Sequence, residues 1–218
     1  MNTFGRIEIV DERDRDYQMS AVVPVAAPGV NYRYWNDNQW WGDQGPHPHC
    51  VAYAWMHWLE DGPVTHKQFP PPLYNPVRVY DRAQLLDQWP GEDYAGTSVR
   101  AGAKVLQEEG KISNYYWTWS SHGIAQAILT TGPVVVGTKW YAGMSTPDSG
   151  YMLRPTGNVL GGHAYVLNGV NVQKGVFRVK NSWGRSWGRW GRAWVSFGDF
   201  QTLLDEGGDA CLAAEVNV

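Results

Sequence analysis

Apolar residues recur at helical spacing in the first part of the chain. From Val51 to Trp58 they lie three and four residues apart, which predicts a helix over residues 50–60 with one apolar face. A Gly-Pro pair at residues 62–63 should end this helix. Residues 66–93 contain five of the 13 prolines, and we interpret them as loop.

Two further helices are predicted from their capping residues. Thr97 or Ser98 can cap a helix that ends at Gly110, because a short polar side chain accepts a hydrogen bond from the first turn. Ser120 or Ser121 can cap the next one, which a second Gly-Pro pair closes at residues 132–133. With the first helix, these two make the first part of the chain mainly helical.

Strand patterns dominate after residue 133. The run Val134–Val136 predicts a buried strand, and apolar and polar residues alternate over residues 163–168 and 177–181. Another strand is predicted over residues 194–197. Because helices come first and strands second, the sequence predicts an α+β protein with two segregated lobes.

Composition narrows the class of protein. The 218 residues are 43% hydrophobic and 18% charged, which suits one large domain or two closely packed lobes with a sizeable core. The net charge of −3, with no Lys/Arg cluster, argues against nucleic acid or a membrane surface as partner. No signal peptide and no apolar run of membrane-spanning length is found, so we expect a soluble protein.

Four residues in a fixed order carry the candidate chemistry. Cys50 lies in the first turn of the first predicted helix, where backbone N–H groups favour a thiolate, and Gln44 precedes it by six residues. His163 could serve Cys50 as a base, and Asn181 could accept a hydrogen bond from the other nitrogen of that imidazole. Gln44 and the Cys50 backbone N–H could donate to a developing oxyanion. These parts suit thiol-mediated acyl transfer.

Two other cysteine and histidine patterns point elsewhere. Cys211 follows two glycines and precedes Leu-Ala-Ala, and we interpret it as a small buried apolar residue. His47, His49 and His57 are metal-ligand types near Cys50, but no second cluster completes a site at zinc-like spacing. The sequence therefore predicts no metal and no cofactor. Two cysteines also cannot form a disulfide framework, which fits a reducing compartment.

The chain resembles the papain-like cysteine peptidases. Three segments carry the likeness: residues 44–54 around Cys50, residues 162–164 around His163, and residues 181–191, which read Asn-Ser-Trp-Gly and continue with glycines. Residues 96–100 resemble the start of the family's second helix. The resemblance implies a helical N-terminal lobe over about 44–131 and an antiparallel, β-barrel-like lobe over about 132–200, followed by a C-terminal tail. Residues 1–27 would be an N-terminal extension of a domain over 28–218.

By the same resemblance, Cys50 is the nucleophile, His163 the general base and then acid, Asn181 its orienting residue and Gln44 an oxyanion donor. Trp183 would shield the hydrogen bond between His163 and Asn181. Gly96, Thr97 and Gly162 are implied as substrate-binding residues, and Gly137 with Gly162 would leave the main pocket roomy. The implied partner is a peptide or protein substrate. The sequence departs from the family at Pro48, His49 and Val51.

The resemblance predicts a cysteine endopeptidase and leaves alternatives open. An amidase, isopeptidase or acyltransferase would use the same residues, because a thioester can pass its acyl group to water or to an amine. A non-catalytic binding module is a third possibility. Only 49 residues precede Cys50, so we expect a short, microbial or viral type of family member, without a long inhibitory propeptide. We expect a cytoplasmic or viral location, and the sequence does not give the oligomeric state.

Overall fold

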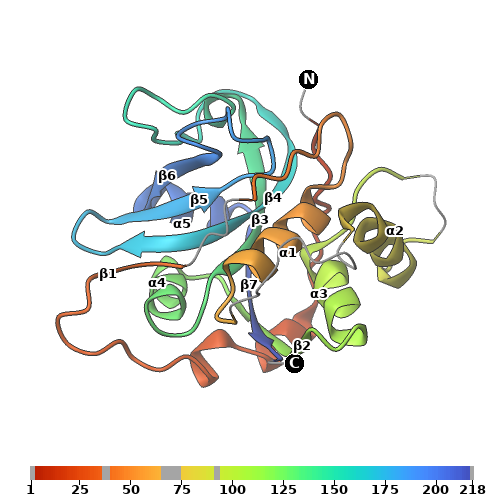
Figure 1. Ribbon diagram of the computed structural model, residues 1–218, viewed down its shortest axis with the longest axis horizontal. Coiled ribbons are helices and arrows are strands. Elements are labelled where there is room, and N and C mark those ends of the chain that lie inside the picture. Colours follow the sequence, from red (N-terminus) through yellow and green to blue (C-terminus); the bar gives the residue numbers. More distant parts are fainter. Residues whose placement is uncertain (1–2, 36–39, 65–74, 91–93, 217–218) are drawn as a thin grey trace.

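The computed structural model describes residues 3–35, 40–64, 75–90 and 94–216. Its centre is an antiparallel sheet in the order β2-β7-β3-β4-β5-β6, with β1 paired to β4 (Figure 1). The strands are β1 Tyr32–Tyr34, β2 Ile112–Thr118, β3 Val134–Tyr141, β4 Val159–Asn171, β5 Val176–Lys180, β6 Arg192–Ser196 and β7 Asp209–Glu215. The helices are α1 Cys50–Asp61, α2 Pro76–Leu86, α3 Val99–Glu108, α4 Ser121–Thr130 and α5 Phe197–Asp205, with short 3-10 helices at Glu12–Asp16, Met19–Ala21 and Ala142–Met144.

Helices cover both faces of the central strands. Val135, Ala164 and Val166 join the core formed with α1, α2 and α3, whereas Val134 and Val136 join the core formed with α4 and α5. Neighbouring residues of a strand point to opposite faces, so the continuous run of valines reflects burial on both sides. The predicted α+β class is confirmed. The sheet is open, with β2 and β6 at its ends, so the barrel-like description fits only loosely.

The three predicted helices are present, and the capping predictions identify their starts. The Ser98 side chain accepts a hydrogen bond from the Ala101 N–H, and the Ser120 side chain accepts one from the Gly123 N–H. Cys50 is the first residue of α1, as predicted. Cys211, on β7, is fully buried against α1–α3, which confirms its interpretation as a buried apolar residue.

The prediction that residues 66–93 are loop is wrong over α2. Asn75 caps this helix by accepting a hydrogen bond from the Val77 N–H, and Pro76 occupies the first turn, where its missing N–H costs nothing. The proline therefore starts a helix here instead of breaking one. The parts of the predicted loop at 66–74 and 91–93 lie outside the described residues. Strands β1, β2 and β7 and helix α5 were not predicted.

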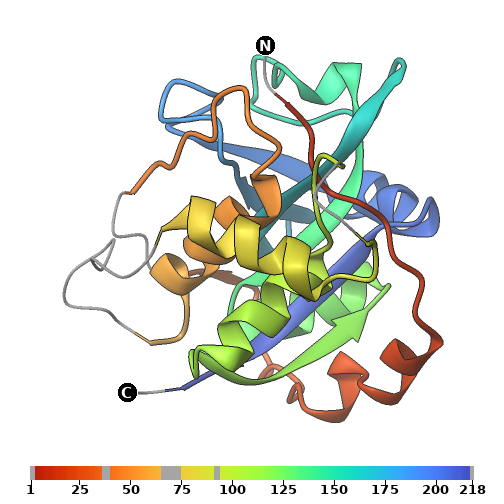
Figure 2. The ribbon, with the colours of Figure 1, turned by 90° about the vertical axis from the view of Figure 1, so that its right-hand side faces the viewer.

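The N-terminal segment crosses the molecule instead of extending away from it. In Figure 2 the red chain runs from the top of the view across the face turned to the viewer, between the yellow α2 and the blue α5. It bonds to both sides on its way, because Ile7 donates to the Thr97 carbonyl next to α3 and Arg6 donates to the Gly162 carbonyl on β4. Among the described residues, no helix is long and apolar enough to span a membrane.

Candidate active site

The first turn of α1 presents Cys50 at the junction of the helices and the sheet. Its thiol is fully buried, and the backbone groups of Ala164, Gly5 and Val51 act to lower its pKa. Ala164 follows His163 directly on β4 and packs in the same core cluster as Cys50, so α1 lies against this strand. The first N–H groups of a helix have no partner within the helix, which makes this position suited to negative charge.

His163 and Asn181 form the hydrogen bond expected of an orienting pair. His163 Nε2 lies 2.8 Å from Asn181 Oδ1, and the Ser182 N–H also donates to that Oδ1 at 2.8 Å. Because Oδ1 only accepts, Nε2 must carry the hydrogen and Nδ1 is left as the basic nitrogen. Nδ1 is buried and has no hydrogen-bond partner among the described residues.

Aromatic rings surround the imidazole of His163. The Trp183 ring centroid lies 4.9 Å from it, and Trp140, on β3, packs against it edge-on at 4.8 Å. Trp140 and Trp183 also contact each other, with centroids 5.0 Å apart. Sequence reasoning singled out Trp183 but not Trp140, since one tryptophan among 13 carries no positional signal. Together the two rings keep water away from the His163–Asn181 hydrogen bond.

Burial holds the candidate pair in its uncharged form. It raises the pKa of Cys50 to about 11, against the opposing effect of the nearby backbone N–H groups. It also lowers the pKa of His163 to about 4, and the hydrogen bond that His163 donates to Asn181 offsets this only in part. The helix N-terminus favours a thiolate, but because the sulfur is fully buried, its desolvation has the larger effect.

Gln44 is oriented by both of its amide atoms. Its Oε1 accepts a hydrogen bond from Ser182 Oγ at 2.6 Å, which turns Nε2 towards the Thr3 carbonyl at 2.9 Å and the His47 carbonyl at 2.8 Å. The side chain is 2% exposed, so this orientation is fixed by its surroundings. A side-chain N–H at this site therefore already donates to the carbonyl of an extended peptide, which here belongs to the chain itself.

The remaining predicted site residues all contact the same N-terminal segment. Thr97 N–H donates to the Gly5 carbonyl at 2.8 Å and the Thr97 carbonyl accepts from Ile7 N–H at 2.9 Å, which pairs the two backbones. A Cβ on Gly96, whose φ is +108°, would lie 2.4 Å from the Gly5 carbonyl oxygen. The Gly162 carbonyl accepts from Arg6 N–H at 2.9 Å.

Residues 3–7 therefore lie against five of the seven residues predicted for the site, namely Gln44, Gly96, Thr97, Gly162 and His163. The Phe4 ring packs edge-on against His163, with centroids 5.8 Å apart. A cavity of about 930 Å³ is lined by this segment together with Leu160, Gly162 and Trp183. Among the described residues, no group of three His, Cys, Asp or Glu side chains could hold a metal ion.

A fully buried ion cluster ties the end of α1 to the strand that precedes Asn181. Lys180 Nζ bonds to Glu60 and, at 3.0 Å, to Asp61 Oδ1, and Asn168 donates to the other Asp61 oxygen at 2.6 Å. Burial raises the pKa of Asp61 to about 6, and the Lys180 charge opposes this rise. This cluster could not be predicted from the sequence, because charged residues are normally exposed.

We expect Lys180→Ala to lower the free energy of unfolding by about 3–5 kcal/mol, because it removes the ammonium that balances two buried carboxylates. Urea denaturation of the purified variant measures this. Lys174→Ala is the matched control, since Lys174 is exposed on the turn before the same strand, and it should change stability little. Equal losses in the two variants would contradict the role of the cluster.

The family model and the curated relatives that match this chain are all described as cysteine proteases or cathepsins. The family model described as papain family cysteine protease matches residues 35–202. Cathepsin B of Dictyostelium discoideum is 33% identical over 95 residues, covering 43% of this chain and 30% of the relative. The cathepsin B-like cysteine proteinase 6 of Caenorhabditis elegans is 24% identical over 170 residues, covering 71% and 45%. The chain thus spans less than half the length of these two curated relatives.

Solved structures show the same fold. Xylellain, a cysteine protease from Xylella fastidiosa, superposes with a TM-score of 0.79 at 18% identity, covering 99% of this chain and 97% of that one. The bromelain protease from Ananas comosus superposes with a TM-score of 0.58 at 15% identity, covering 96% and 98%. Because the family model matches more than half of the sequence, this protein belongs to the papain family of cysteine proteases.

Proposed function

We propose that the protein is a cysteine endopeptidase that hydrolyses peptide bonds through a thioester on Cys50. The observation that carries this proposal is the tautomer of His163. Its Nε2–H is committed to Asn181, and its Nδ1 is bare and has no partner among the described residues. The next residue, Ala164, packs in the same core cluster as Cys50, and a bare imidazole nitrogen is what a thiol needs to lose its proton.

In the proposed reaction, His163 Nδ1 takes the proton of the Cys50 thiol as the sulfur attacks the carbonyl carbon. Gln44 Nε2–H and the Cys50 backbone N–H donate to the oxygen as it becomes negative. When the C–N bond breaks, His163 returns the proton to the leaving amine. Water then gives a proton to His163 and attacks the thioester, which releases the acid and restores the thiol.

A peptide is the substrate class that the surroundings of Cys50 favour. Thr97, Gly162 and Gln44 bond to backbone N–H and carbonyl groups of an extended chain, and these are groups that any peptide presents. A small amide would leave most of them unused. An isopeptidase or acyltransferase with the same residues is the second candidate, since an amine could take the place of water at the thioester.

The test is cleavage of a peptide library by the purified full chain. Wild-type protein and Cys211→Ala should cleave internal bonds, whereas Cys50→Ala should not, although both substitutions remove one buried thiol. Transfer of the acyl group to an added amine, with little hydrolysis, would favour the acyltransferase. If the folded wild-type protein neither cleaves peptides nor transfers an acyl group, the non-catalytic binding module would be the remaining interpretation.

Alkylation of Cys50 should be slow at neutral pH and rise with pH towards about 11, because only the thiolate reacts and burial has raised the Cys50 pKa. At pH 7 a thiol with that pKa is ionised to roughly one part in 10⁴. Iodoacetamide labelling across pH 5–10, read by mass spectrometry, measures this. Cys211, with a pKa raised well above 9, is the internal comparison and should react more slowly. Labelling of Cys50 that is fast and independent of pH would contradict the burial of its thiol and the raised pKa.

A further inference from the structure

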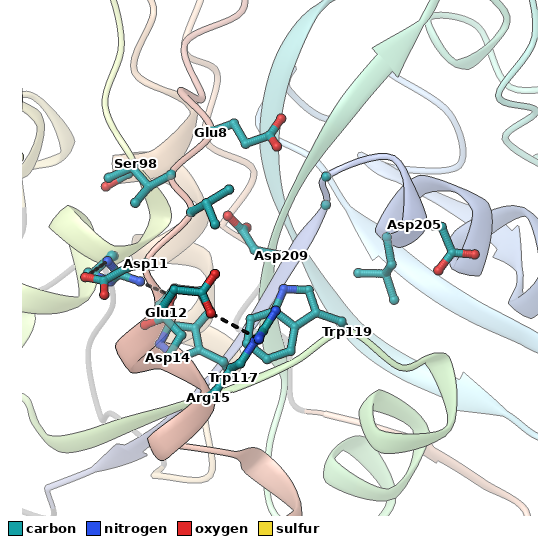
Figure 3. Close-up of a pocket in the computed structure, with 16 residues that line it drawn as sticks. Glu8, Asp11, Glu12, Asp14, Arg15, Ser98, Trp117, Trp119, Asp205 and Asp209 are labelled. Carbon is teal, nitrogen blue, oxygen red and sulfur yellow. Dashed lines mark hydrogen bonds and ion pairs between the residues drawn. The ribbon is translucent and has the colours of Figure 1, made fainter.

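Two arginines of the loop between β5 and β6 differ from most other charged residues of the molecule. Most arginines bond to acceptors of their own chain, and Figure 3 shows one such place, a cavity of about 410 Å³ where Arg100 pairs with Asp11 at 2.7 Å. Arg185 and Arg189 are exposed, and among the described residues neither guanidinium has a hydrogen-bond or ion-pair partner. Residues 184–192 hold three arginines and no acidic residue, spaced too widely to form a basic run in the sequence.

Indole rings hold these guanidinium groups in place. The guanidinium carbon of Arg185 lies 4.9 Å from the ring centroid of Trp41, and that of Arg192 lies 5.9 Å from the same ring. The guanidinium carbon of Arg189 lies 5.6 Å from the ring centroid of Trp190. A guanidinium that rests its face on an indole keeps its N–H donors at the edge, where they suit a carboxylate.

Trp190 is exposed and has an unfavourable backbone conformation. Its φ is +57°, in the left-handed region that bulky residues rarely adopt, and the residue is 56% exposed. Trp41 Nε1 donates to the Trp190 carbonyl at 2.5 Å and the Gly191 N–H donates to the Trp187 carbonyl at 2.8 Å, so the loop is fixed in this shape. An exposed indole gains little from packing, and backbone outliers of this kind are typical of functional sites.

This loop adjoins the candidate active site. Figure 2 shows the orange chain before α1 beside the blue loop between β5 and β6, and the Gln44 N–H donates to the Ser182 carbonyl at 2.9 Å. Trp183, which packs against the candidate catalytic histidine, comes two residues before Arg185. An extended peptide advances about 3.3 Å per residue, so one that leaves the cleft past Trp183 meets the loop a few residues from the cleaved bond.

We propose that Arg185, Arg189 and Trp190, with Trp41 beneath, form a docking surface for an acidic segment of the peptide substrate, on one side of the cleaved bond. This rests on the proposed peptidase function. Aspartate or glutamate side chains of the segment would pair with the two arginines, and the Trp190 indole would pack against the peptide between them. A nucleic acid is a poorer fit, because its binding commonly neutralises about six to ten phosphates and this surface offers two or three cations.

The first experiment compares peptides that differ only in charge. Library peptides cleaved at the same bond receive a run of glutamates or of glutamines on either side of that bond. On one side, the glutamate peptide should be hydrolysed with a kcat/KM about threefold to tenfold higher, since each exposed charge pair contributes modestly. The preference should disappear near 1 M salt, where the Debye length is about 3 Å. A ratio close to one on both sides would overturn the proposal.

Two double variants locate the preference on the molecule. Arg185→Gln with Arg189→Gln should bring the glutamate-to-glutamine ratio close to one. Arg78→Gln with Arg82→Gln is the matched control, because it removes two exposed arginines of α2 and changes the net charge equally, and it should keep the wild-type ratio. Equal losses in the two double variants would mean that net charge alone attracts the peptide, and this would overturn the docking surface.

Trp190→Gly separates a binding role of the indole from a structural one. Glycine adopts a positive φ without strain, so the variant should keep or raise the melting temperature and still weaken the glutamate preference. A lower melting temperature with an unchanged preference would overturn the place of Trp190 in the docking surface.

A binding measurement does not depend on turnover. Full-length Cys50→Ala should bind a labelled glutamate-rich peptide, read by fluorescence anisotropy, and adding Arg185→Gln and Arg189→Gln should weaken binding about threefold to tenfold. No binding, or tighter binding of a single-stranded oligonucleotide of the same length, would overturn the proposal. If the wild-type protein hydrolyses no peptide but this binding is obtained, the peptidase function fails and the docking surface stands.

Discussion

His163→Ala should reduce peptide hydrolysis by about 10²–10⁴-fold, the usual contribution of a positioned acid–base group. Without His163, the Cys50 thiol has no acceptor for its proton and the leaving amine has no donor. Asn181 cannot substitute, because its Oδ1 accepts hydrogen bonds and carries no titratable proton. Single-turnover and steady-state rates on a cleaved library peptide, expressed per folded molecule, measure the loss.

Two further variants make this result decisive. His163 is fully buried between two tryptophans, so alanine also leaves a cavity, and His163→Gln keeps most of the volume while removing the base. His122→Ala is the control, since His122 is exposed on α4. A folded His163→Gln protein with a near wild-type rate would assign the base to another histidine, with His49 beside Cys50 the first to examine.

Gln44→Ala should slow acylation by about 10²–10³-fold, equivalent to about 3–4 kcal/mol, and leave substrate affinity nearly unchanged. The reason is that the donor is needed most when charge develops on the substrate oxygen, and less when the carbonyl is neutral. In the resting protein Gln44 Nε2 already donates to the carbonyl of Thr3, so its direction needs no rearrangement. Single-turnover acylation at saturating and limiting peptide separates the rate from the affinity.

The competing explanation is that Gln44 only stabilises the loop before α1, since it also donates to the His47 carbonyl. In that case Gln44→Ala would lower the melting temperature and leave acylation per folded molecule intact. Ser182→Ala is a useful comparison, because it removes the hydrogen bond that orients the Gln44 amide but keeps the donor itself. A smaller rate loss in Ser182→Ala than in Gln44→Ala is expected.

Local signals were enough to predict several helices. A serine that caps a first turn acts on residues three positions away, and Ser98 and Ser120 do this as expected. The same reasoning should have found α2, because Asn75-Pro76 is a helix start. Counting prolines over 66–93 hid that signal. The cluster of candidate site residues could also be predicted from the sequence, through the resemblance, while their chemical roles stay predictions until variants are measured.

Long-range pairings could not be predicted in the same way. Strand β2 pairs with β7, nearly a hundred residues later, and nothing within either segment specifies the other. The Lys180 cluster follows the same pattern, since its charged residues lie on α1 and β5 and look like surface residues in each segment. No apolar periodicity in the sequence indicates the path of residues 3–8 either, because backbone hydrogen bonds and the side chain of one arginine hold this segment in place.

The covered cleft has a consequence for any measurement of affinity. An occupant that is part of the same chain has a fixed local concentration, on the order of millimolar for short flexible connections, which dilution does not reduce. A peptide must compete with it at every enzyme concentration. Its apparent dissociation constant is therefore the intrinsic constant divided by the fraction of molecules whose cleft is open. Weak apparent binding of a peptide would then reflect how tightly residues 3–8 bind in the cleft, rather than how poorly the cleft fits its substrate.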